Sequence, residues 1–577
     1  MQNNTLKVLS IALGTSVLFT ACDGLKKMIK KQNLITYDVT PKPLEMHADS
    51  VSVAISGKYP AKLFAKKAVV TVTPVLKYNG TEKKLKPVTL VGEKATATGT
   101  KIAYQTGGTF SYTDKFAYEP DMKVAKLELQ AQGAVKKKTK DFNSIELAEG
   151  TIATPLLVRN DEKTIYAKDA FVKTTSANQS SSVYYPVNQS NVRPAELKSE
   201  EVKKMMEFLS KNAINTTWYD FKSIEVSAYA SPDGELSRNE NLAKDRAKSG
   251  SEALAAEFKK DKNKENTFGK DIAQYKTVTT AEDWNGFKSL MEQSSIADKD
   301  LILRVLTMYA DGDQREKEIK NLSKTYKEVA DQILPKLRRS VLTLVVDKKS
   351  RTDEMINRLV DTNPDSLSVE ELLYAATLTE DVNRKMNIYK SAEKYFASDW
   401  RTSNNLGITY LLNNKVDDAK AAFERADKSS PNNQTVLNNL GAAVAKKGDR
   451  KAALAIFEKA GNAPETNYNK GIVSIREGNY SEAISQFGSF KGFNLALAQL
   501  LSGSAESVNG TIDASNEKDM AICHYLKAIA AARKGDAKGL DSLKTAVEKD
   551  ATLKAKAKDD CEFLKWRAND QFKTLVN

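Results

Sequence analysis

The sequence predicts a multidomain protein with an N-terminal all-β sandwich, a central α/β domain and a C-terminal α-solenoid. Three observations predict this order. Apolar and polar residues alternate over residues 37–157, strands alternate with amphipathic helices over residues 170–347, and a 34-residue repeat lies within residues 365–577. A chain of 577 residues, of which 41% are hydrophobic, is long enough to bury several separate cores.

An apolar run at residues 8–19 follows Lys7 and is closed by the five residues Leu-Phe-Thr-Ala-Cys at positions 18–22. The run is too short to span a bilayer, and small residues before a cysteine favour cleavage. This stretch resembles a bacterial lipoprotein signal peptide, so we expect residues 1–21 to be removed. The resemblance implies that Cys22 carries diacylglycerol and a fatty acid, which together anchor a protein stably. An ordinary secretory signal with a chance cysteine is the alternative.

Residues 22–36 form a basic tether that contains Lys26, Lys27, Lys30 and Lys31. A lysine close to an anionic membrane surface contributes about 1 kcal/mol to binding. The chain resembles envelope lipoproteins of Bacteroidota, which mark surface exposure with an acidic cluster after the cysteine, and here only Asp23 is present. We therefore expect the periplasmic face of the outer membrane. An inner-membrane location is the alternative, because a single aspartate resembles a retention signal in other lineages.

The first domain, residues 37–157, is predicted to consist of short strands. Val51, Val53 and Ile55 alternate with polar residues, and further apolar runs surround a Tyr-Asn-Gly turn at residues 78–80. Asn-Gly between two such runs is a strong hairpin signal. Several short strands separated by turn residues are typical of a β-sandwich. We find no catalytic motif in this region.

The second domain, residues 170–347, is predicted to be α/β. Ser199 can cap a helix in which Val202, Met205 and Leu209 share one face. A strand with alternating apolar residues follows at residues 224–228, and the apolar run at residues 341–346 is typical of a buried final strand. Between them, the loop Ser-Pro-Asp-Gly at residues 231–234 leads into a second amphipathic helix.

This loop and helix resemble the OmpA-like peptidoglycan-binding family. Five residues fall on its motif at the correct spacing: Gly234, Asn239, Leu242, Arg246 and Ala247. In that family an aspartate and the arginine hold the carboxylate end of a diaminopimelate side chain. Here Ser231 occupies the position of the aspartate, and Ala243 that of a serine.

The resemblance implies a candidate peptidoglycan-binding or anion-binding site made of Ser231, Asp233, Asn239 and Arg246. Arginine offers two parallel donors to a carboxylate, and the start of a helix favours an anion. Because Ser231 carries no charge, the negative partner for the ligand's ammonium group is missing unless Asp233 reaches the site. Losing one charge-assisted contact costs about 1.5–3 kcal/mol, so weak or absent peptidoglycan binding is expected. Retention of the fold as a scaffold, with Arg246 in a helix-surface ion pair, is the alternative.

The third region, residues 365–577, contains an internal repeat. Leu406, Gly407, Ala419 and Phe423 are matched 34 residues later by Leu440, Gly441, Ala453 and Phe457, and a third copy carries Gly471, Ala483 and Phe487. This pattern is similar to the tetratricopeptide repeat. Small residues at the glycine and alanine positions allow paired helices to approach, and stacked repeats form an extended concave face. These apolar residues are therefore expected to form a core and not a cofactor pocket.

Polar residues lie between the packing positions of the first helix of each repeat. Asn404, Asn405 and Thr409 are candidates for partner binding in the first repeat, and Asn438 and Asn439 are their counterparts in the second. An asparagine side chain has both a donor and an acceptor, which suits it to the backbone of a bound protein. We expect these side chains to face the concave groove and to be dispensable for folding. Ordinary solvated helix residues are the alternative.

Two further observations limit the chemistry. After lipidation the remaining cysteines are Cys523 and Cys561, and the sequence leaves open whether they form a disulfide. His47 and His524 have no metal-ligand spacing, and no Gly-rich phosphate loop is present. We therefore expect no enzymatic activity, no metal and no cofactor. The net charge of +14 comes from scattered lysines without a nucleic-acid motif, so no nucleic-acid partner is expected.

Together these features predict a non-enzymatic, lipid-anchored periplasmic adaptor or scaffold. It would recruit a partner protein through its tetratricopeptide repeats in a cell-envelope complex. The alternative is a peptidoglycan-binding anchor that links the outer membrane to the cell wall. The sequence names neither the partner nor the oligomeric state.

Overall fold

The computed structural model describes residues 20–577, with side chains described from Gly24 onward except for Ser323. The predicted signal peptide, residues 1–21, lies almost wholly outside the described residues. The chain divides into two compact units. Unit 1 combines the residues up to Lys168 with Asp381–Asn577, and unit 2 is Asp169–Glu380. The α/β region is thus inserted between the β-rich region and the helical region.

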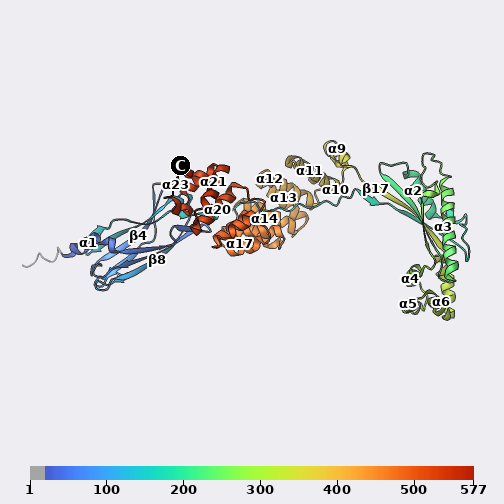
Figure 1. Cartoon of the computed structure of the whole chain (residues 1–577), viewed down its shortest axis with the longest axis horizontal. Helices are drawn as coiled ribbons and strands as arrows, with labels where there is room; N and C mark the ends of the chain where they lie inside the picture. The colour runs from blue at the N-terminus through green and yellow to red at the C-terminus, as the bar shows by residue number, and fades with distance from the viewer. Residues whose placement is uncertain (1–19) are drawn as a thin grey trace, which may run out of the picture. The chain divides into compact units, whose positions relative to one another are not determined.

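The β-rich part of unit 1 consists of two sheets that enclose one hydrophobic core (Figure 1). Alternation decides which residues enter the core, since Val51, Val53 and Ile55 are buried and their neighbours are exposed. The first sheet contains β1 (Thr36–Thr40), β2 (Leu44–His47), β3 (Ser50–Tyr59), β8 (Gly108–Ala117) and β12 (Thr151–Ile152). The second contains β4 (Val69–Tyr78), β5 (Thr81–Lys84), β6 (Val88–Gly92), β7 (Thr100–Ile102), β9 (Lys126–Val135), β10 (Lys138–Asp141) and β11 (Ile145–Glu149).

The predicted Asn-Gly hairpin joins β4 and β5, where Tyr78 pairs with Thr81. Asn79 and Gly80 both have positive φ values, 49° and 75°. Two such residues in a row are required by the two-residue turn whose twist matches that of antiparallel strands. The hairpin prediction is therefore confirmed.

The basic residues after Cys22 form a helix, which corrects the expectation of a tether between the lipid and the first domain. Helix α1 (Thr20–Lys30) includes Cys22 and is followed by a short 3-10 turn, Gln32–Leu34. Leu25 and Met28 are fully buried in the core of the β-sandwich. One face of the helix therefore closes the end of the sandwich, and the lysines lie on the exposed face.

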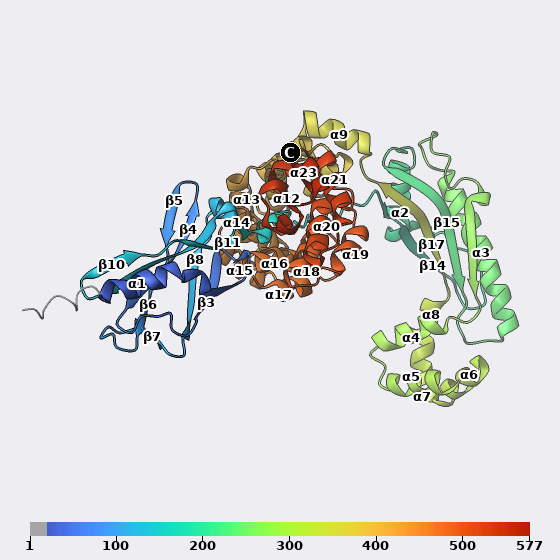
Figure 2. The same cartoon turned by 60° about the vertical axis from the view of Figure 1, so that its left-hand side comes forward.

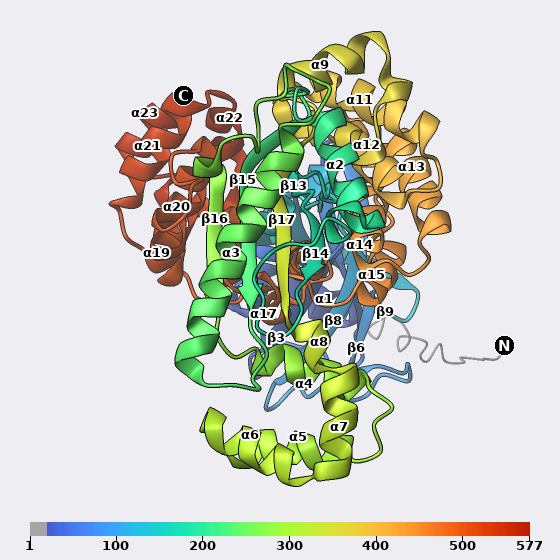
Figure 3. The ribbon, with the colours of Figure 1, turned by 90° about the vertical axis from the view of Figure 1, so that its right-hand side faces the viewer.

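Unit 2 contains a five-stranded mixed sheet in the order β13-β17-β15-β16, with β14 also paired to β17. Helices α2 and α3 lie on the same face of this sheet (Figure 3) and share its core. As predicted, the side chain of Ser199 caps α2 by accepting the N–H of Val202. The elements are β13 (Thr174–Ser176), β14 (Gln179–Tyr184), α2 (Glu200–Asn212), β15 (Tyr219–Tyr229), α3 (Leu236–Phe258), β16 (Tyr275–Thr280) and β17 (Arg339–Lys349).

Five further helices of unit 2 lie between β16 and β17 and form a small core of their own. They are α4 (Trp284–Gln293), α5 (Lys299–Met308), α6 (Gly312–Asn321), α7 (Ser323–Gln332) and α8 (Leu334–Leu337). Unit 2 ends with α9 (Asp353–Thr362) and α10 (Val369–Ala375).

The helical array of unit 1, Asp381–Asn577, consists largely of antiparallel helix pairs (Figure 2). Its first helices are α11 (Val382–Tyr395), α12 (Trp400–Leu412), α13 (Val416–Ser429), α14 (Gln434–Lys446), α15 (Arg450–Lys459), α16 (Pro464–Arg476) and α17 (Tyr480–Phe487). They are followed by α18 (Phe493–Leu501), α19 (Ser507–Asp513), α20 (Ala521–Lys534), α21 (Gly539–Lys549), α22 (Thr552–Asp559) and α23 (Asp570–Val576). No helix within residues 20–577 is long and apolar enough to cross a membrane.

The repeated glycines explain the packing within each helix pair. A Cβ atom at Gly407, Gly441 or Gly471 would lie 2.5, 2.6 or 2.8 Å from the ring of the phenylalanine on the next helix, namely Phe423, Phe457 or Phe487. Such distances are too short for carbon atoms, so any larger side chain would push the helices apart. The repeated glycine is therefore required by close helix contact.

The β-sandwich makes direct contacts within unit 1 with α15 and with the last helices of the array. Thr154 donates from Oγ1 to Glu562 Oε1 at 2.5 Å, and Arg533 Nε donates to the other oxygen of Glu562 at 2.9 Å. Ion pairs join Asp49 to Arg450 and Glu149 to Arg567, each at 2.8 Å. The array therefore starts beyond unit 2 in the sequence but packs back against the sandwich.

Candidate functional site

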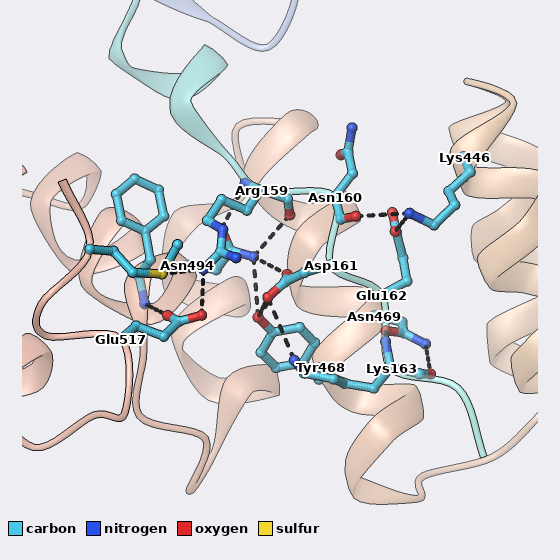
Figure 4. Close-up of polar contacts among 12 residues, drawn as sticks. Arg159, Asn160, Asp161, Glu162, Lys163, Lys446, Tyr468, Asn469, Asn494 and Glu517 are labelled. Carbon is cyan, nitrogen blue, oxygen red and sulfur yellow. Dashed lines mark hydrogen bonds and ion pairs between the residues drawn. The ribbon is translucent and has the colours of Figure 1, made fainter. Parts of the chain in front are cut away.

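The concave face of the helical array holds a segment of the same chain. Residues 159–167, which we call the threaded segment, have no regular secondary structure and connect the β-sandwich to unit 2. The segment crosses α18, α16, α14 and α12 in that order, so it runs opposite to the order of the helices along the chain. Figure 4 shows its N-terminal half among the side chains of the array.

Four asparagines of the array each bind one residue of the threaded segment through both of its backbone groups. In each case Oδ1 accepts the N–H and Nδ2 donates to the C=O, at distances of 2.7–3.0 Å. The pairs are Asn494 with Arg159, Asn469 with Lys163, Asn439 with Ile165, and Asn405 with Ala167. The clamped residues are all odd-numbered because alternate residues of an extended chain point their backbone groups to the same side.

Two more asparagines connect these clamps. Asn404 Nδ2 donates to the C=O of Ile165 at 3.2 Å, and Asn438 Nδ2 donates to that of Lys163 at 2.9 Å. Side chain to side chain bonds join Asn404 to Asn405 and Asn438 to Asn439, both at 3.0 Å. Further bonds run between repeats, from Asn439 to Asn404 and from Asn469 to Asn438. The result is a continuous row of five hydrogen-bonded carboxamides, from Asn405 to Asn469, while Asn494 bonds to Tyr468 and Asp161 instead.

These six asparagines are 0–1% exposed. Burying a polar side chain is costly unless it is hydrogen-bonded, and here each carboxamide bonds to the threaded segment and to a neighbouring polar group. The interior location of the asparagines thus depends on the segment being in place. Their burial argues against the expectation that they are dispensable for folding, which stays a prediction.

Side chains of the threaded segment add charged contacts near its N-terminal end. Arg159 forms an ion pair with Glu517. The carboxylate of Asp161 accepts the hydroxyl of Tyr468, 2.9 Å from each oxygen, and burial raises the pKa of this tyrosine. Lys163 Nζ lies 4.7 Å from the centre of the Tyr468 ring, a favourable cation–π distance. The array therefore recognises side chains as well as backbone here.

Glu162 and Lys446 form the second charged contact. The Glu162 side chain is only 2% exposed and its Oε2 lies 3.4 Å from Lys446 Nζ, which also donates to the C=O of Asn160 at 3.0 Å. Burial raises the pKa of the Glu162 carboxyl, and the nearby ammonium group offsets part of this effect. Lys446 thus contacts both Asn160 and Glu162 of the threaded segment through one ammonium group.

An open hollow of about 500 Å³ lies beside the threaded segment. Asp161–Thr164 line it together with Ile408, Leu411 and Leu412 of α12. The side chain of Leu412 is 60% exposed. The concave face is therefore not completely filled by the chain's own residues.

Four of the five predicted groove residues, Asn404, Asn405, Asn438 and Asn439, contact a protein backbone, but it belongs to this chain and not to a partner. The fifth, Thr409, donates to the C=O of Leu406 in its own helix, and no hydrogen bond joins it to the segment among the described residues. Sequence reasoning missed Asn469 and Asn494, because the repeat spacing shortens to 30 and then 25 residues. An asparagine on the first helix of each later pair was the available signal.

A family model of the tetratricopeptide repeat matches residues 401–433, the pair α12 and α13. The chain carries a tetratricopeptide repeat. No curated protein matches the chain. Among solved structures, YrrB, described as a tetratricopeptide repeat protein with an unusual peptide-binding site, is 21% identical and covers 36% of this chain and 99% of its own, with a TM-score of 0.22.

Two other solved structures match the chain at lower identity. PilW, a type IV pilus biogenesis factor, is 17% identical and covers 40% of this chain and 100% of its own, with a TM-score of 0.27. Yeast Tom70 is 9% identical and covers 65% of this chain and 92% of its own, also with a TM-score of 0.27. Values this low add no argument beyond the repeat itself. Repeats of this type mediate protein–protein interaction.

The second candidate site lies in unit 2, in the loop after β15. Ser231, Asp233, Asn239 and Arg246 do gather there, but their polar groups bind other parts of the chain. The guanidinium of Arg246, 1% exposed, donates to the C=O groups of Gln189 at 3.0 Å and Tyr229 at 2.8 Å. Burial lowers the pKa of Arg246 to about 10. It forms no ion pair with Asp245 or Glu240 among the described contacts.

Asp233 is bound by a cation that sequence reasoning did not identify. Arg338 donates from Nη2 to the Asp233 carboxylate at 3.0 Å and from Nε to Ser231 Oγ at 3.2 Å, and Ser231 in turn donates to Asp233. Asn239 Nδ2 donates to the C=O groups of Ser231 and Gly234. In this structure the predicted ligand residues therefore stabilise the loop and leave no free carboxylate or exposed guanidinium.

The cysteines of the helical array are free thiols, so the structure does not contain the disulfide that the sequence left open. Cys523 is buried in the core of the last helices. Cys561 packs against Gly150 of the β-sandwich and donates from Sγ to the C=O of Lys123 at 3.3 Å. Within residues 20–577, no group of three or more metal-binding side chains is present.

Proposed function

We propose that this protein is a non-enzymatic scaffold whose repeat array binds an extended protein segment. In the state described here that segment is its own, residues 159–167. A partner protein with an extended segment takes its place when the two proteins assemble. The array then holds the partner with the same asparagines that now hold the chain itself.

The asparagine clamps carry this proposal. Each one binds an N–H and a C=O of one residue, and these groups are present in every residue except proline, which lacks the N–H. The array therefore prefers any segment with an extended backbone. The amino-acid sequence of that segment has a smaller effect on binding. Arg159, Asp161 and Glu162 provide that secondary preference, since their partners Glu517, Tyr468 and Lys446 belong to the array.

Competition with the threaded segment would make partner binding selective. A segment of the same chain competes at an effective concentration in the millimolar range, so a weak ligand does not displace it. The hollow beside Asp161–Thr164, with the exposed Leu412 at its edge, offers a first contact for an incoming chain. A partner that uses this contact as well as the clamps gains affinity that the segment lacks.

We further propose that the scaffold is lipid-anchored through Cys22 on the periplasmic face of the outer membrane, with the inner membrane as the alternative. The lipoprotein-like signal sequence that ends at Cys22 and the single acidic residue Asp23 support this. The peptidoglycan-anchor alternative is not favoured by the loop after β15, because Arg246 and Asp233 are both bonded internally.

Proline variants of the threaded segment test the proposal without changing the array. Lys163→Pro with Ile165→Pro removes two clamped N–H groups, so the segment should leave the groove. Thr164→Pro is the matched control, since no hydrogen bond of its N–H is found among the described residues. The probe is a fluorescent synthetic peptide with the sequence of residues 158–168, and binding is measured by anisotropy.

The double proline variant should bind this peptide, whereas the parent and Thr164→Pro should not. Adding Asn405→Ala and Asn439→Ala to the double proline variant should abolish binding, because two clamps are lost. If the double variant does not bind the peptide while its circular dichroism is unchanged, the groove serves only to fix the chain's own residues 159–167. The partner must then bind elsewhere, with the β-sandwich as the next surface to test.

A further inference from the structure

Two lysine-rich segments that are about a hundred residues apart in sequence meet at one end of the β-sandwich. The first is α1 with the turn that follows it, residues 22–34, and the second is the β9–β10 hairpin with its turn, residues 135–143. Figure 2 shows α1 and β10 side by side. The sequence predicted a membrane role for the first segment only.

Direct contacts hold the two segments together. Gly133 in β9 lies against Leu25 of α1, so closely that a Cβ atom there would be 2.8 Å from the leucine Cδ2. Gln32 exchanges two hydrogen bonds with the backbone of Asn143, one at 3.1 Å to its N–H and one at 3.3 Å to its C=O. The relative position of the segments is therefore defined by packing and by hydrogen bonds.

The register of the hairpin decides which way its lysines point. Lys138 is opposite Val135 and Lys140 is opposite Gly133 in the antiparallel pair β9 and β10. Residues directly opposite each other share one face of a sheet. Because α1 packs on the face of Gly133, Lys138 and Lys140 lie on the same side of the sheet as the helix.

Eight lysines are exposed on these two segments, and we call them the lysine platform. They are Lys26, Lys27, Lys30, Lys31, Lys136, Lys137, Lys138 and Lys140. None of them forms an ion pair with a described residue, although many other lysines of the chain do. The acidic residues of the two segments are Asp23 and Asp141, and Asp141 is hydrogen-bonded by Gln132. The platform is therefore strongly positive.

We propose that the lysine platform binds the surface of an anionic lipid bilayer and sets the orientation of the β-sandwich on it. Cys22 lies in α1 itself, so the residue proposed to carry the lipid is part of the same helix as three of the lysines, Lys26, Lys27 and Lys30. A lipid at this position leaves no spacer between the membrane and the sandwich. Unpaired positive charge around the anchor is complementary to negatively charged headgroups.

A bilayer fits the platform better than another anion. A polyanion such as nucleic acid is usually bound with aromatic side chains that stack on its bases. The aromatic residue of these two segments, Phe142, packs instead against the core of the β-sandwich. The inference rests on the proposed lipid anchor for its location, but the electrostatic contact does not require the lipid to form. The two can therefore be tested separately.

Vesicle co-sedimentation of the full chain with Cys22→Ser tests the platform without the lipid. The probes are vesicles of phosphatidylcholine alone and of phosphatidylcholine mixed with phosphatidylglycerol, at low and high salt. Binding is expected only to the anionic vesicles and should weaken as salt screens the charges. Replacing Lys136, Lys137, Lys138 and Lys140 by Gln should reduce it by roughly a hundredfold or more.

The matched control replaces four exposed lysines of unit 2, Lys259, Lys262, Lys264 and Lys276, by Gln. This variant should bind like the Cys22→Ser parent. Equal binding to neutral and anionic vesicles would overturn the proposal. So would an equal loss of binding in the platform variant and in the unit 2 control variant. Stronger sedimentation with purified sacculi than with vesicles would also overturn it, by assigning the platform to the cell wall. A separate experiment tests the lipid anchor itself. If the protein with Cys22 intact takes up no fatty-acid label, the anchor proposal fails, whatever the vesicles show.

Discussion

Asn439 and Ile165 are 274 positions apart in the chain, yet one side chain binds both backbone groups of the other residue, each at 2.8 Å. The geometry is that of a strand pair in which a carboxamide replaces the neighbouring strand. The array and the threaded segment therefore form one structural element. A substitution in the array or in the segment should affect the stability of both.

Asn439→Ala should loosen the threaded segment. It leaves the N–H and C=O of Ile165 and the Oδ1 of Asn404 without this partner, which should cost about 2–4 kcal/mol. Amide hydrogen exchange of residues 159–168, followed by mass spectrometry, should become roughly a hundredfold faster. Asn467→Ala on the same helix as Asn469 is the control, since Asn467 bonds only to nearby Asn462. Equal exchange in both variants would show that the clamp contributes nothing.

Gly441→Ala should destabilise the array, because the new methyl group would lie 2.6 Å from Cε1 of Phe457. Overpacking of this kind costs about 1–3 kcal/mol. Gly510→Ala is the matched helical control, as nothing lies within 4 Å of its Cβ, and it should be neutral or stabilising by up to about 1 kcal/mol. Thermal unfolding measured by circular dichroism compares the two. A lower midpoint for Gly510→Ala than for Gly441→Ala would contradict the packing argument.

Ser231→Asp should not create peptidoglycan binding. The new carboxylate would share Arg338 with Asp233, and Arg246 would remain bonded to Gln189 and Tyr229. We expect no increase in co-sedimentation with purified sacculi and a lower unfolding temperature, since two carboxylates would compete for one cation. Strong sedimentation of the unmodified protein that Arg246→Ala abolishes would instead support the peptidoglycan-anchor function.

Cys523 and Cys561 should react slowly with iodoacetamide in the folded protein. Burial raises the pKa of each thiol to about 11, so at pH 8 roughly one molecule in a thousand carries a thiolate, which is the reactive form. Both should react fully after denaturation without reductant. Mass spectrometry of the alkylated peptides checks this. A disulfide-linked pair of peptides would show that the two residues do pair in the cell.

Cys22→Ala should abolish lipid attachment. Without the thiol no diacylglycerol can be added, so the signal peptide should also remain uncleaved by the lipoprotein signal peptidase. Metabolic labelling with a fatty-acid analogue measures the first effect, and the mass of the mature chain measures the second. A variant that labels as strongly as the parent places the anchor elsewhere.

Local sequence patterns determined much of this protein. The alternation of Val51, Val53 and Ile55 predicted a strand with one buried face, and Asn79-Gly80 predicted the turn between β4 and β5. The spacing of Gly407 and Gly441 predicted the helix pairs, because a glycine is needed wherever a phenylalanine of the next helix approaches so closely. The position of the asparagines on the concave face also followed from this spacing.

Only the tertiary structure decided what those asparagines bind. Residues 159–167 show no helical or strand periodicity, since their backbone groups pair with side chains of the array and not with a neighbouring strand or turn. Such pairing leaves no local pattern to detect. The same reason applies to Arg246 and Asp233, whose partners Gln189, Tyr229 and Arg338 are distant in sequence. Periodicity records which face of an element is buried, whereas the identity of a long-range partner depends on how the whole chain packs.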